Sequence, residues 1–477
     1  MSSPPKVVVV GAGISGLATA YSLKKSGAQV TLLEANSWAG GPIESEEIDG
    51  FLVENGPHTL LLRSQAVSDL LDEVGLLARA VDAKEVASTR YVLKEGEPIA
   101  LPGGPQDLLS TSILSTQAKL RLLAEPFFPR FDEEGIDETL ASFVTRRLGE
   151  EVLDYLVDPF VGGIWAGNPD QLSARYSFPL LKNWEDDGGS LFLGALKKKL
   201  GTPSFFKRTD SNGESQRATP SRLLSFPGGM GDLAGAFQKE LKEELLLSSP
   251  VRKLRKDEDS WRVFYQQGKR RRGIQADAVV LTLPPSELAK VEWEMDSPPV
   301  EKVKELSTMA YAPCNLVQFG FRRADVEHPL DGLGLLIPRV EYRNLLGVLF
   351  VSSMFPQRAP ENTVLLSCFV GGSRQPHLAA LEDEEMIEGA LLDLEEILGV
   401  RGAPVFQRIK RWNRAIPQYE VGHHYYVQRM ESLESEQRGL FFAGNFHDSI
   451  GLPALLEASL AHGQRISSYL KNLGRTK

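Results

Sequence analysis

The sequence predicts an α/β fold in which a parallel sheet is joined by a mixed sheet and by a helical region. Three patterns predict it. A β-branched run near the N-terminus, Lys6 to Val10, leads through glycines into a helix-forming stretch and a second strand-like run. Residues 107–200 are rich in helix formers, and strand-like runs recur between residues 315 and 370. Alternating strand and helix patterns favour a parallel sheet, whereas successive strands favour a mixed or antiparallel one.

The composition excludes several classes of protein. With 477 residues, 42% hydrophobic side chains and a net charge of −10, the chain can build more than one core and carries too little positive charge for a general nucleic-acid binder. Its two cysteines cannot form a disulfide framework, and no histidines have metal-ligand spacing, so no metal site is expected. No apolar run reaches the roughly 18 residues of a membrane-spanning helix.

The N-terminal end contains the parts of a nucleotide-binding βαβ unit. The first strand is followed by Gly11-Ala12-Gly13-Ile14-Ser15-Gly16 and by a helix expected over residues 17–26. A second strand is expected over residues 29–33 and ends at Glu34. A signal peptide over residues 7–23 is the alternative, because Ala18-Thr19-Ala20 imitates a cleavage site. The glycines favour the nucleotide site.

Each of these residues has a physical task in such a unit. Gly11 allows the tight turn, Gly13 lets the backbone approach a pyrophosphate, and Gly16 lets the helix and strand pack closely. The N-terminus of the helix presents free N–H groups and a positive dipole to the phosphates. Glu34 stands where its carboxylate can accept hydrogen bonds from a ribose. A bound dinucleotide is therefore expected.

Two further motifs identify the dinucleotide. Gly40-Gly41 follows the acid, and Glu54-Asn55-Gly56-Pro57-His58-Thr59 follows a short apolar stretch. This order resembles the flavin-dependent amine oxidase superfamily. The resemblance implies FAD as the cofactor, with the Gly-Gly pair at its phosphates and the Gly-Pro turn beside the flavin. Pro42 stands where many members carry Arg, Lys or Trp, which removes one phosphate contact.

The C-terminal end supplies the second half of the expected FAD site. Residues 439–445 form an apolar run that ends in Gly444-Asn445, and Gly451-Leu452-Pro453 then precedes a helix expected over residues 454–470. Pro453 suits a first helical turn. The resemblance places this helix N-terminus under the flavin, where its dipole stabilises negative charge. Asn445 replaces the Asp or Glu of many relatives, and an amide can still bind the ribityl or phosphate groups.

The middle of the chain divides into three parts. In residues 107–200, the stretch 113–131 mixes large apolar side chains with Lys and Arg, which fits either a helix in the protein core or a helix in a membrane interface. Residues 201–221 are polar and predict a surface loop. Lys269-Arg270-Arg271-Arg272 is expected in a hairpin turn. Strands at 315–321, 334–337, 345–352 and 364–370, followed by an acidic helix at 383–398, predict the mixed sheet.

No hydrolase nucleophile motif is present, and further blocks make the resemblance closer. They span the whole chain and look like the protoporphyrinogen oxidase family: Arg90-Tyr91, Leu101-Pro102, residues 160–168 (FVGGIWAGN), Leu172-Ser173, Phe178-Pro179, residues 226–230 (FPGGM), residues 369–374 (FVGGSR), Trp412 and residues 416–419 (IPQY).

This second resemblance implies roles for particular residues. Arg90 aligns with an arginine that pairs a substrate propionate, and the carbonyl of Gly163 faces pyrrole N–H groups. Leu336, Leu349 and Phe369 align with residues that sandwich the macrocycle. No protein side chain is expected to be catalytic, because the flavin accepts the hydride. The full set expected at FAD is Gly11, Ala12, Gly13, Ile14, Ser15, Gly16, Glu34, Ala35, Gly40, Gly41, Gly56, Pro57, His58, Thr59, Val251, Trp412, Gly444, Asn445, Ile450, Gly451 and Leu452.

The resemblance also organises the chain. We expect a discontinuous FAD-binding domain (residues 1–85, 222–290 and 407–477), a substrate-binding domain (86–106 and 291–406), and a helical domain (107–200) that attaches peripherally to a membrane. The implied reaction is oxidation of protoporphyrinogen IX to protoporphyrin IX with O2 as the acceptor, a late step of tetrapyrrole biosynthesis. Further expectations are a homodimer, hand-over of the product to ferrochelatase, and a cytoplasmic, bacterial-type location on the inner face of the cell membrane, with an organelle membrane still open.

Three alternatives remain at this point. A coproporphyrinogen III oxidase would act on a ring with four propionates and would need more cations near the pocket. An amine oxidase is disfavoured because Asn445 replaces the usual Glu. A GDI-like lipid-binding protein would share the fold without flavin, and the intact glycines and Glu34 argue against it.

Overall fold

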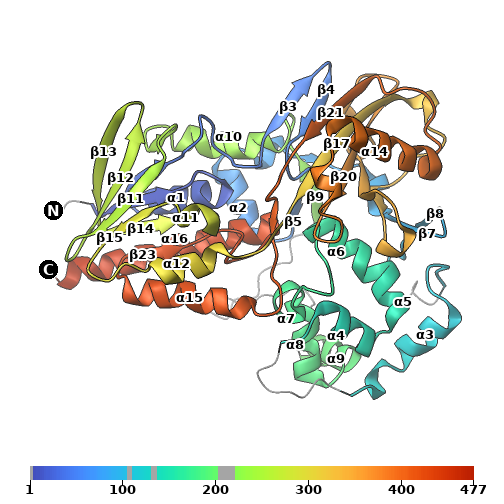
Figure 1. Cartoon of the computed structure of the whole chain (residues 1–477), viewed down its shortest axis with the longest axis horizontal. Helices are drawn as coiled ribbons and strands as arrows, with labels where there is room; N and C mark the ends of the chain where they lie inside the picture. The colour runs from blue at the N-terminus through green and yellow to red at the C-terminus, as the bar shows by residue number, and fades with distance from the viewer. Residues whose placement is uncertain (1–3, 105–109, 130–136, 202–220, 477) are drawn as a thin grey trace.

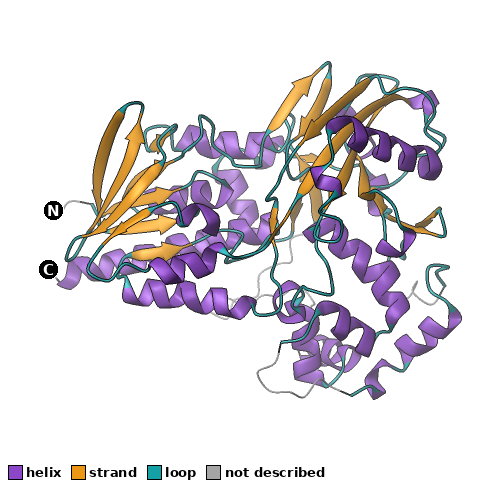
Figure 2. Ribbon diagram, in the orientation of Figure 1, coloured by secondary structure: helices purple, strands orange, loops and turns teal. Residues whose placement is uncertain are grey.

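The structure is a computed structural model that describes residues 4–104, 110–129, 137–201 and 221–476 (Figure 1). Almost all of the predicted surface loop, residues 202–220, lies outside the described residues. Both termini lie at one end of the molecule, beside a parallel sheet, and the helices of residues 116–201 gather at the opposite end (Figures 1 and 2). The predicted α/β architecture, a parallel sheet accompanied by other sheets, is confirmed.

The parallel sheet joins strands from both ends of the chain and from its middle. Its order is β10-β2-β1-β14-β23, with every neighbouring pair parallel. Val7 to Val10 in the central strand are almost completely buried, as expected where both faces of a sheet are covered. The strands are β1 (Lys6–Val10), β2 (Gln29–Leu33), β10 (Leu245–Leu246), β14 (Ala278–Leu281) and β23 (Leu440–Phe442).

Different elements cover the two faces of this sheet. On the face of Val7 and Val9, α1 packs along α16, with α2 and α10 beside them. On the face of Val8 and Val10 lie a small sheet and helices α12 and α15. The helices are α1 (Ile14–Lys25), α2 (Gln65–Glu73), α10 (Gly231–Glu240), α12 (Val300–Ser307), α15 (His423–Glu436) and α16 (Leu452–Thr476).

The small sheet corrects one expectation from the sequence. Its strands are β11 (Val251–Lys256), β12 (Trp261–Gln267), β13 (Arg270–Ala276) and β15 (Glu292–Glu294). Three of the four residues in the basic run, Arg270 to Arg272, lie in β13, and the turn is Gly268-Lys269. The prediction of a basic turn was wrong because β13 is a solvent-exposed strand, in which pairing with β12 outweighs the repulsion among its charges.

A second large sheet of seven strands is mixed, as predicted. Its order is β21-β17-β20-β19-β18-β7-β8, and only the pair of β18 and β7 is parallel. Helix α14 (Asp383–Leu398) has the bounds that the sequence predicts and covers one face. The strands are β7 (Tyr91–Lys94), β8 (Glu97–Ala100), β17 (Cys314–Arg322), β18 (Gly334–Leu336), β19 (Leu345–Phe350), β20 (Thr363–Gly371) and β21 (Phe406–Lys410).

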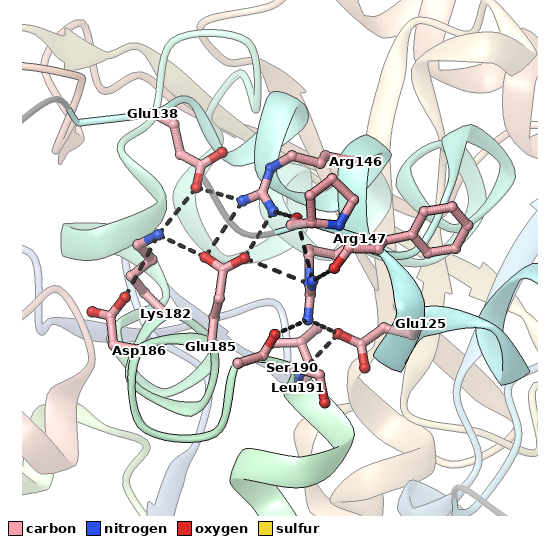
Figure 3. A network of polar contacts seen from close by, with 12 residues as sticks. Glu125, Glu138, Arg146, Arg147, Lys182, Glu185, Asp186, Ser190 and Leu191 are labelled. Carbon is pink, nitrogen blue, oxygen red and sulfur yellow. Dashed lines mark hydrogen bonds and ion pairs between the residues drawn. The ribbon is translucent and has the colours of Figure 1, made fainter. Parts of the chain in front are cut away.

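The helical region is held together by a buried network of charges (Figure 3). Arg147 is fully buried and forms ion pairs with Glu125 and Glu185, the second across 3.5 Å. Arg146 and Lys182 also bind Glu185, at 2.7 and 2.6 Å. The network joins the elements α4 (Leu140–Arg147), α8 (Pro179–Gly188), α9 (Leu191–Gly201) and the 3-10 turn η4 (Glu125–Phe127), beside α3 (Thr116–Leu123).

Helix α6 (Asp158–Trp165) fastens this helical region to the seven-stranded sheet. Its buried Asp158 forms an ion pair with Arg374, at 2.5 Å, and accepts the backbone N–H of Arg339, at 2.8 Å. Figure 1 shows α6 between the helices and the sheet. Within the described ranges, no helix combines the length and the apolarity needed to cross a bilayer.

Candidate active site

Two glycine loops form the floor of the candidate cofactor site. Gly13 and Gly40 form a parallel β-bridge, and the backbone N–H of Gly40 donates to the carbonyl of Ala12 across 2.7 Å. A Cβ added to Gly16 would lie 1.9 Å from the carbonyl oxygen of Gly11, so the helix can pack here only without a side chain. A Cβ added to Gly13, in contrast, meets no atom within 4 Å. Open space therefore lies above the backbone at Gly13, where a pyrophosphate requires it.

Glu34 connects this floor to the next strand. Its carboxylate is buried and accepts the backbone N–H of Ala12 at 2.7 Å and that of Asn36 at 2.9 Å. Its carbonyl accepts the N–H of Ser249, which brings the segment before Val251 to the same edge of the sheet. Ala35 follows Glu34 directly. The acid is thus fixed at the C-terminal end of β2, where the ribose of a dinucleotide binds in this fold.

The C-terminal loop lies at the end of β23 and leads into α16. Gly444 has a φ of 139°, which favours glycine, and the carbonyl of Asn445 accepts the hydroxyl of Tyr419. Gly451 directly precedes α16, and its carbonyl accepts the N–H of Leu455. Ile450 packs in the core of the helical region. The helix begins at Leu452, two residues earlier than the sequence predicts.

The Gly56-Pro57-His58-Thr59 turn meets the seven-stranded sheet. His58 is buried, and its Nε2 lies 2.9 Å from the hydroxyl of Ser367 in β20. Burial, with the nearby charge of Arg358, lowers the pKa of His58 to about 4, so the ring is neutral at pH 7. The indole N–H of Trp412 donates to the carbonyl of Asn55 across 2.7 Å. The turn and Trp412 are therefore adjacent.

The predicted substrate residues of the sheet share one face. Val348 and Cys368 face α14 in the core, so alternation directs Leu349 and Phe369 to the opposite face. There Leu349 is the cross-strand neighbour of Ser367, and Gly347 is aligned with both Phe369 and Leu336. Leu336, Leu349 and Phe369 are only half-buried within strands that are otherwise mostly buried. They form an apolar wall that neighbouring core residues cover only in part.

Gly163 lies against this wall. A Cβ added to Gly163 would lie 2.5 Å from the Cδ2 of Leu336, so α6 approaches β18 closely because residue 163 has no side chain. The ring of Phe369 meets His58 edge-on, with centroids 6.0 Å apart. Phe369, which is expected at the macrocycle, therefore contacts His58, which is expected at the flavin.

Arg90 is exposed and directly precedes β7. Within the described part of the chain its guanidinium has no hydrogen-bond or ion-pair partner. It lies two residues before Val92, which is aligned with Leu336 in the parallel pair. A free cation beside an apolar wall is available to bind a carboxylate.

A buried ion pair that the sequence does not predict lies behind the Gly-Pro turn. Glu54 is 2% exposed and lies 3.3 Å from the guanidinium of Arg358, which is 1% exposed. Burial raises the pKa of Glu54 to about 7, against the opposing effects of Ser45 and Arg358. Glu54 belongs to a motif that the sequence displays, but nothing near Arg358 in the chain marks it as the partner.

The site offers binding surfaces and no activated nucleophile among its cysteines. Burial raises the pKa of Cys314 to about 12, and burial likewise raises that of Cys368, so neither is a thiolate at neutral pH. The open space above Gly13, the fixed carboxylate of Glu34 and the glycine loops fit a dinucleotide. These residues would hold the phosphates and ribose of FAD.

Comparison with known proteins decides the family. The family model described as "Flavin containing amine oxidoreductase" matches residues 14–469. The chain belongs to this family. It is an FAD-dependent oxidoreductase. The mitochondrial protoporphyrinogen oxidase of Nicotiana tabacum is 35% identical over 99% of this chain and 96% of the relative.

Two other proteins widen the comparison. The coproporphyrinogen III oxidase of Bacillus subtilis is 27% identical over 97% of this chain and 98% of its own length. A solved structure from Exiguobacterium sp. 255-15, named as a candidate protoporphyrinogen oxidase, has a TM-score of 0.77 at 26% identity and covers 98% of this chain and 99% of that one. The chain therefore has relatives that match nearly its full length under both names, protoporphyrinogen oxidase and coproporphyrinogen III oxidase.

Proposed function

We propose that this flavoenzyme oxidises protoporphyrinogen IX to protoporphyrin IX, with O2 as the final acceptor. The apolar wall of Leu336, Leu349 and Phe369, with the free cation of Arg90 near its edge, carries the proposal. A porphyrinogen is a large apolar ring with anionic tails, and it needs these two features together. Relatives named protoporphyrinogen oxidase that match nearly the full chain support the assignment.

The residues of the chain would bind and orient this substrate. Arg90 would hold a propionate through paired hydrogen bonds, and the wall would exclude water from the ring. The carbonyl of Gly163 would accept pyrrole N–H groups. Bound FAD would supply a two-electron acceptor for repeated rounds of oxidation. Neutral His58, held by Ser367, would add no charge beside the ring.

The decisive experiment is anaerobic bleaching of the oxidised-flavin absorbance by candidate reductants. Protoporphyrinogen IX should bleach the flavin faster than coproporphyrinogen III, and amines should not bleach it. Faster bleaching by coproporphyrinogen III would instead support the second candidate, which the Bacillus subtilis relative favours. Purified protein that is colourless and binds no FAD would contradict both.

Arg90 gives a test of the substrate site. Arg90→Ala should raise KM for protoporphyrinogen about tenfold, because it removes a charge-assisted pair to a carboxylate, and should leave the bound flavin intact. Arg90→Lys is the matched control, since it keeps the charge and loses the paired geometry. Unchanged kinetics in Arg90→Ala would refute this role.

We also propose that the helical region rests on a membrane surface. Leu120, Leu123 and Phe127 are 62%, 61% and 88% exposed, and Phe192 on α9 is 63% exposed. Leu120 and Leu123 lie on α3, and Phe127 belongs to η4. Phe192 lies close to η4 because the backbone N–H groups of Leu191 and Phe192 both donate to Glu125. Lys119 and Lys197 lie on the same helices and suit anionic headgroups, whereas the guanidinium of Arg121 donates to the carbonyls of Thr145 and Arg146.

Co-flotation with vesicles that contain anionic lipid tests the membrane proposal. Phe127→Asp should abolish flotation, because it places a charge where an aromatic ring would enter the interface. Tyr342→Asp is the control, since Tyr342 is 89% exposed but lies beside the seven-stranded sheet. Equal flotation of Phe127→Asp and the unmodified protein would contradict the proposal.

A further inference from the structure

Asp448 lies in the loop between β23 and α16 and closes a small ring within it. Its Oδ2 accepts the backbone N–H of Gly444 across 2.8 Å, and its own N–H donates to the carbonyl of Gly444 across 2.9 Å. Gly444, with its φ of 139°, is thereby held from two sides. The side chain of Asp448 is only 9% exposed.

The other carboxylate oxygen of Asp448 binds two imidazoles. Its Oδ1 lies 2.7 Å from Nδ1 of His447 and 2.8 Å from Nε2 of His462, which belongs to α16. Arg465 lies 3.2 Å from Nδ1 of His462 and can only donate, so this nitrogen accepts and Nε2 carries the proton given to Asp448. The orientation of the ring is thus determined by its neighbours.

The contacts continue from His462 back to the parallel sheet. Arg465 binds Glu434 of α15 through two bonds of 2.5 and 3.0 Å. Glu434 in turn accepts the backbone N–H of Phe442 in β23, across 2.7 Å. A closed circuit of hydrogen bonds therefore connects β23, the loop, α16 and α15.

The same three side chains, His447, Asp448 and His462, bring their ligand atoms within 4.8 Å of one another, as metal ligands would. A cation would bind the lone pair on Nε2 of His462. Because Nδ1 already accepts from Arg465, the ring would then carry no proton on either nitrogen. Hydrogen bonding satisfies all of these atoms without that cost. The cluster is thus a hydrogen-bonded brace.

We propose that Asp448 is a positioning residue for FAD binding. It holds the loop from Gly444 to Leu452 in place, because it binds Gly444 within the loop and His462 of α16 at the same time. This loop carries the residues expected to contact FAD, and Asp448 binds its first residue, Gly444. The proposal rests on the assignment of this loop to the cofactor site. The brace also fastens the loop to α16, whose N-terminus is expected under the flavin.

Asp448→Asn tests the proposal in the full-length protein. Three donors converge on the carboxylate, and an amide presents its NH2 to at least one of them, so one side of the brace must open. Titration of the deflavinated protein with FAD should show a Kd raised at least tenfold, and the visible spectrum of the bound flavin should change. Asp393→Asn is the matched control: Asp393 is 2% exposed and holds the backbone N–H groups of Asn344 and Leu345 against α14. Its FAD affinity should not change.

Variants of His462 decide the question if Asp448→Asn does not fold. His462→Gln keeps an N–H donor near the position of Nε2 and should retain FAD affinity, whereas His462→Leu should lose it. An unchanged Kd and spectrum in Asp448→Asn, or equal losses in Gln and Leu variants, would overturn the proposal. Stoichiometric zinc in the purified protein would also overturn it. A protein that binds FAD but oxidises no porphyrinogen would refute the proposed function and leave this inference standing.

Discussion

Gly13→Val separates cofactor binding from folding. The backbone of Gly13 has φ −66° and ψ 175°, a conformation that valine adopts without strain, and its Cβ position meets no protein atom within 4 Å. The added side chain would instead fill the space that a pyrophosphate needs. We expect the variant to fold and to lose FAD.

The magnitude follows from the hydrogen bonds that the substitution blocks. The first N–H groups of α1 have no partner within the helix, and each charge-assisted bond to a phosphate contributes about 1.5–3 kcal/mol. Loss of two such bonds predicts a Kd for FAD raised roughly a hundredfold to ten-thousandfold. The effect on unfolding should stay within about 1 kcal/mol, because the poorer helix cap is offset by the stiffer unfolded chain.

Isothermal titration of the deflavinated protein and urea unfolding measure the two effects. Gly235→Ala is the control: Gly235 lies exposed inside α10 with open space around it, so alanine should add about 0.5–1 kcal/mol of stability and leave FAD binding unchanged. Gly16→Val should fail to fold, because its Cβ would strike the carbonyl of Gly11. A Gly13→Val protein with normal flavin content would refute the assignment of this loop.

Three further substitutions test other parts of the structure. Gly163→Ala should raise KM a few-fold with unchanged flavin content, because the added Cβ pushes the flexible end of the Leu336 side chain aside. Steady-state assays should also show that adding Leu336→Ala reverses the rise in KM. No rise, or no reversal, would contradict the close approach of Gly163 to Leu336. Glu54→Gln should flatten the pH dependence of stability. Because the pKa of Glu54 is raised to about 7, its contribution to stability is fully present below about pH 4.5 and falls by up to about 3 kcal/mol as pH rises to 7, which urea unfolding across this range measures. Arg147→Met leaves Glu125 buried without its cation partner, while Glu185 keeps Arg146 and Lys182. It should cost about 3–5 kcal/mol, seen as faster hydrogen exchange in α4 and α9, and unchanged exchange would argue against the network.

The elements that the sequence predicted well are those with strong local signals. The strand Gln29–Leu33 and the helix Asp383–Leu398 have their predicted bounds, since an apolar run and a helical period are properties of neighbouring residues. Strands β7, β8 and β11 were not predicted. β7 and β11 each pair with a strand from a more distant part of the chain, β18 and β15, whereas β8 pairs with β7 across a short turn. The charges of the basic run suggest a turn, whereas pairing with the neighbouring strand β12 makes Arg270 to Arg272 part of β13.

The candidate site shows the same division. The motifs at Gly11–Gly16 and Gly56–Thr59 are contiguous. The first could be recognised from its chemistry and the second from its resemblance to a known family. Asp448 and His462 are 14 residues apart, and neither forms a motif. Arg358 stands far from Glu54 in the sequence and reaches it where the turn Pro356–Arg358 packs against the strand Phe51–Glu54.

The sequence alone indicated a dinucleotide site and the order of strands and helices around the glycine loops, because backbone approach to a phosphate demands particular residues at adjacent positions. Its resemblance to a known family indicated FAD. Only the tertiary structure decided which residues face one another: Gly163 against Leu336, His58 against Ser367, and Asp448 between two histidines. Contacts of this kind depend on side-chain directions set by sheet register and helix packing. Those directions arise from the burial of the whole chain and leave no local trace in the sequence.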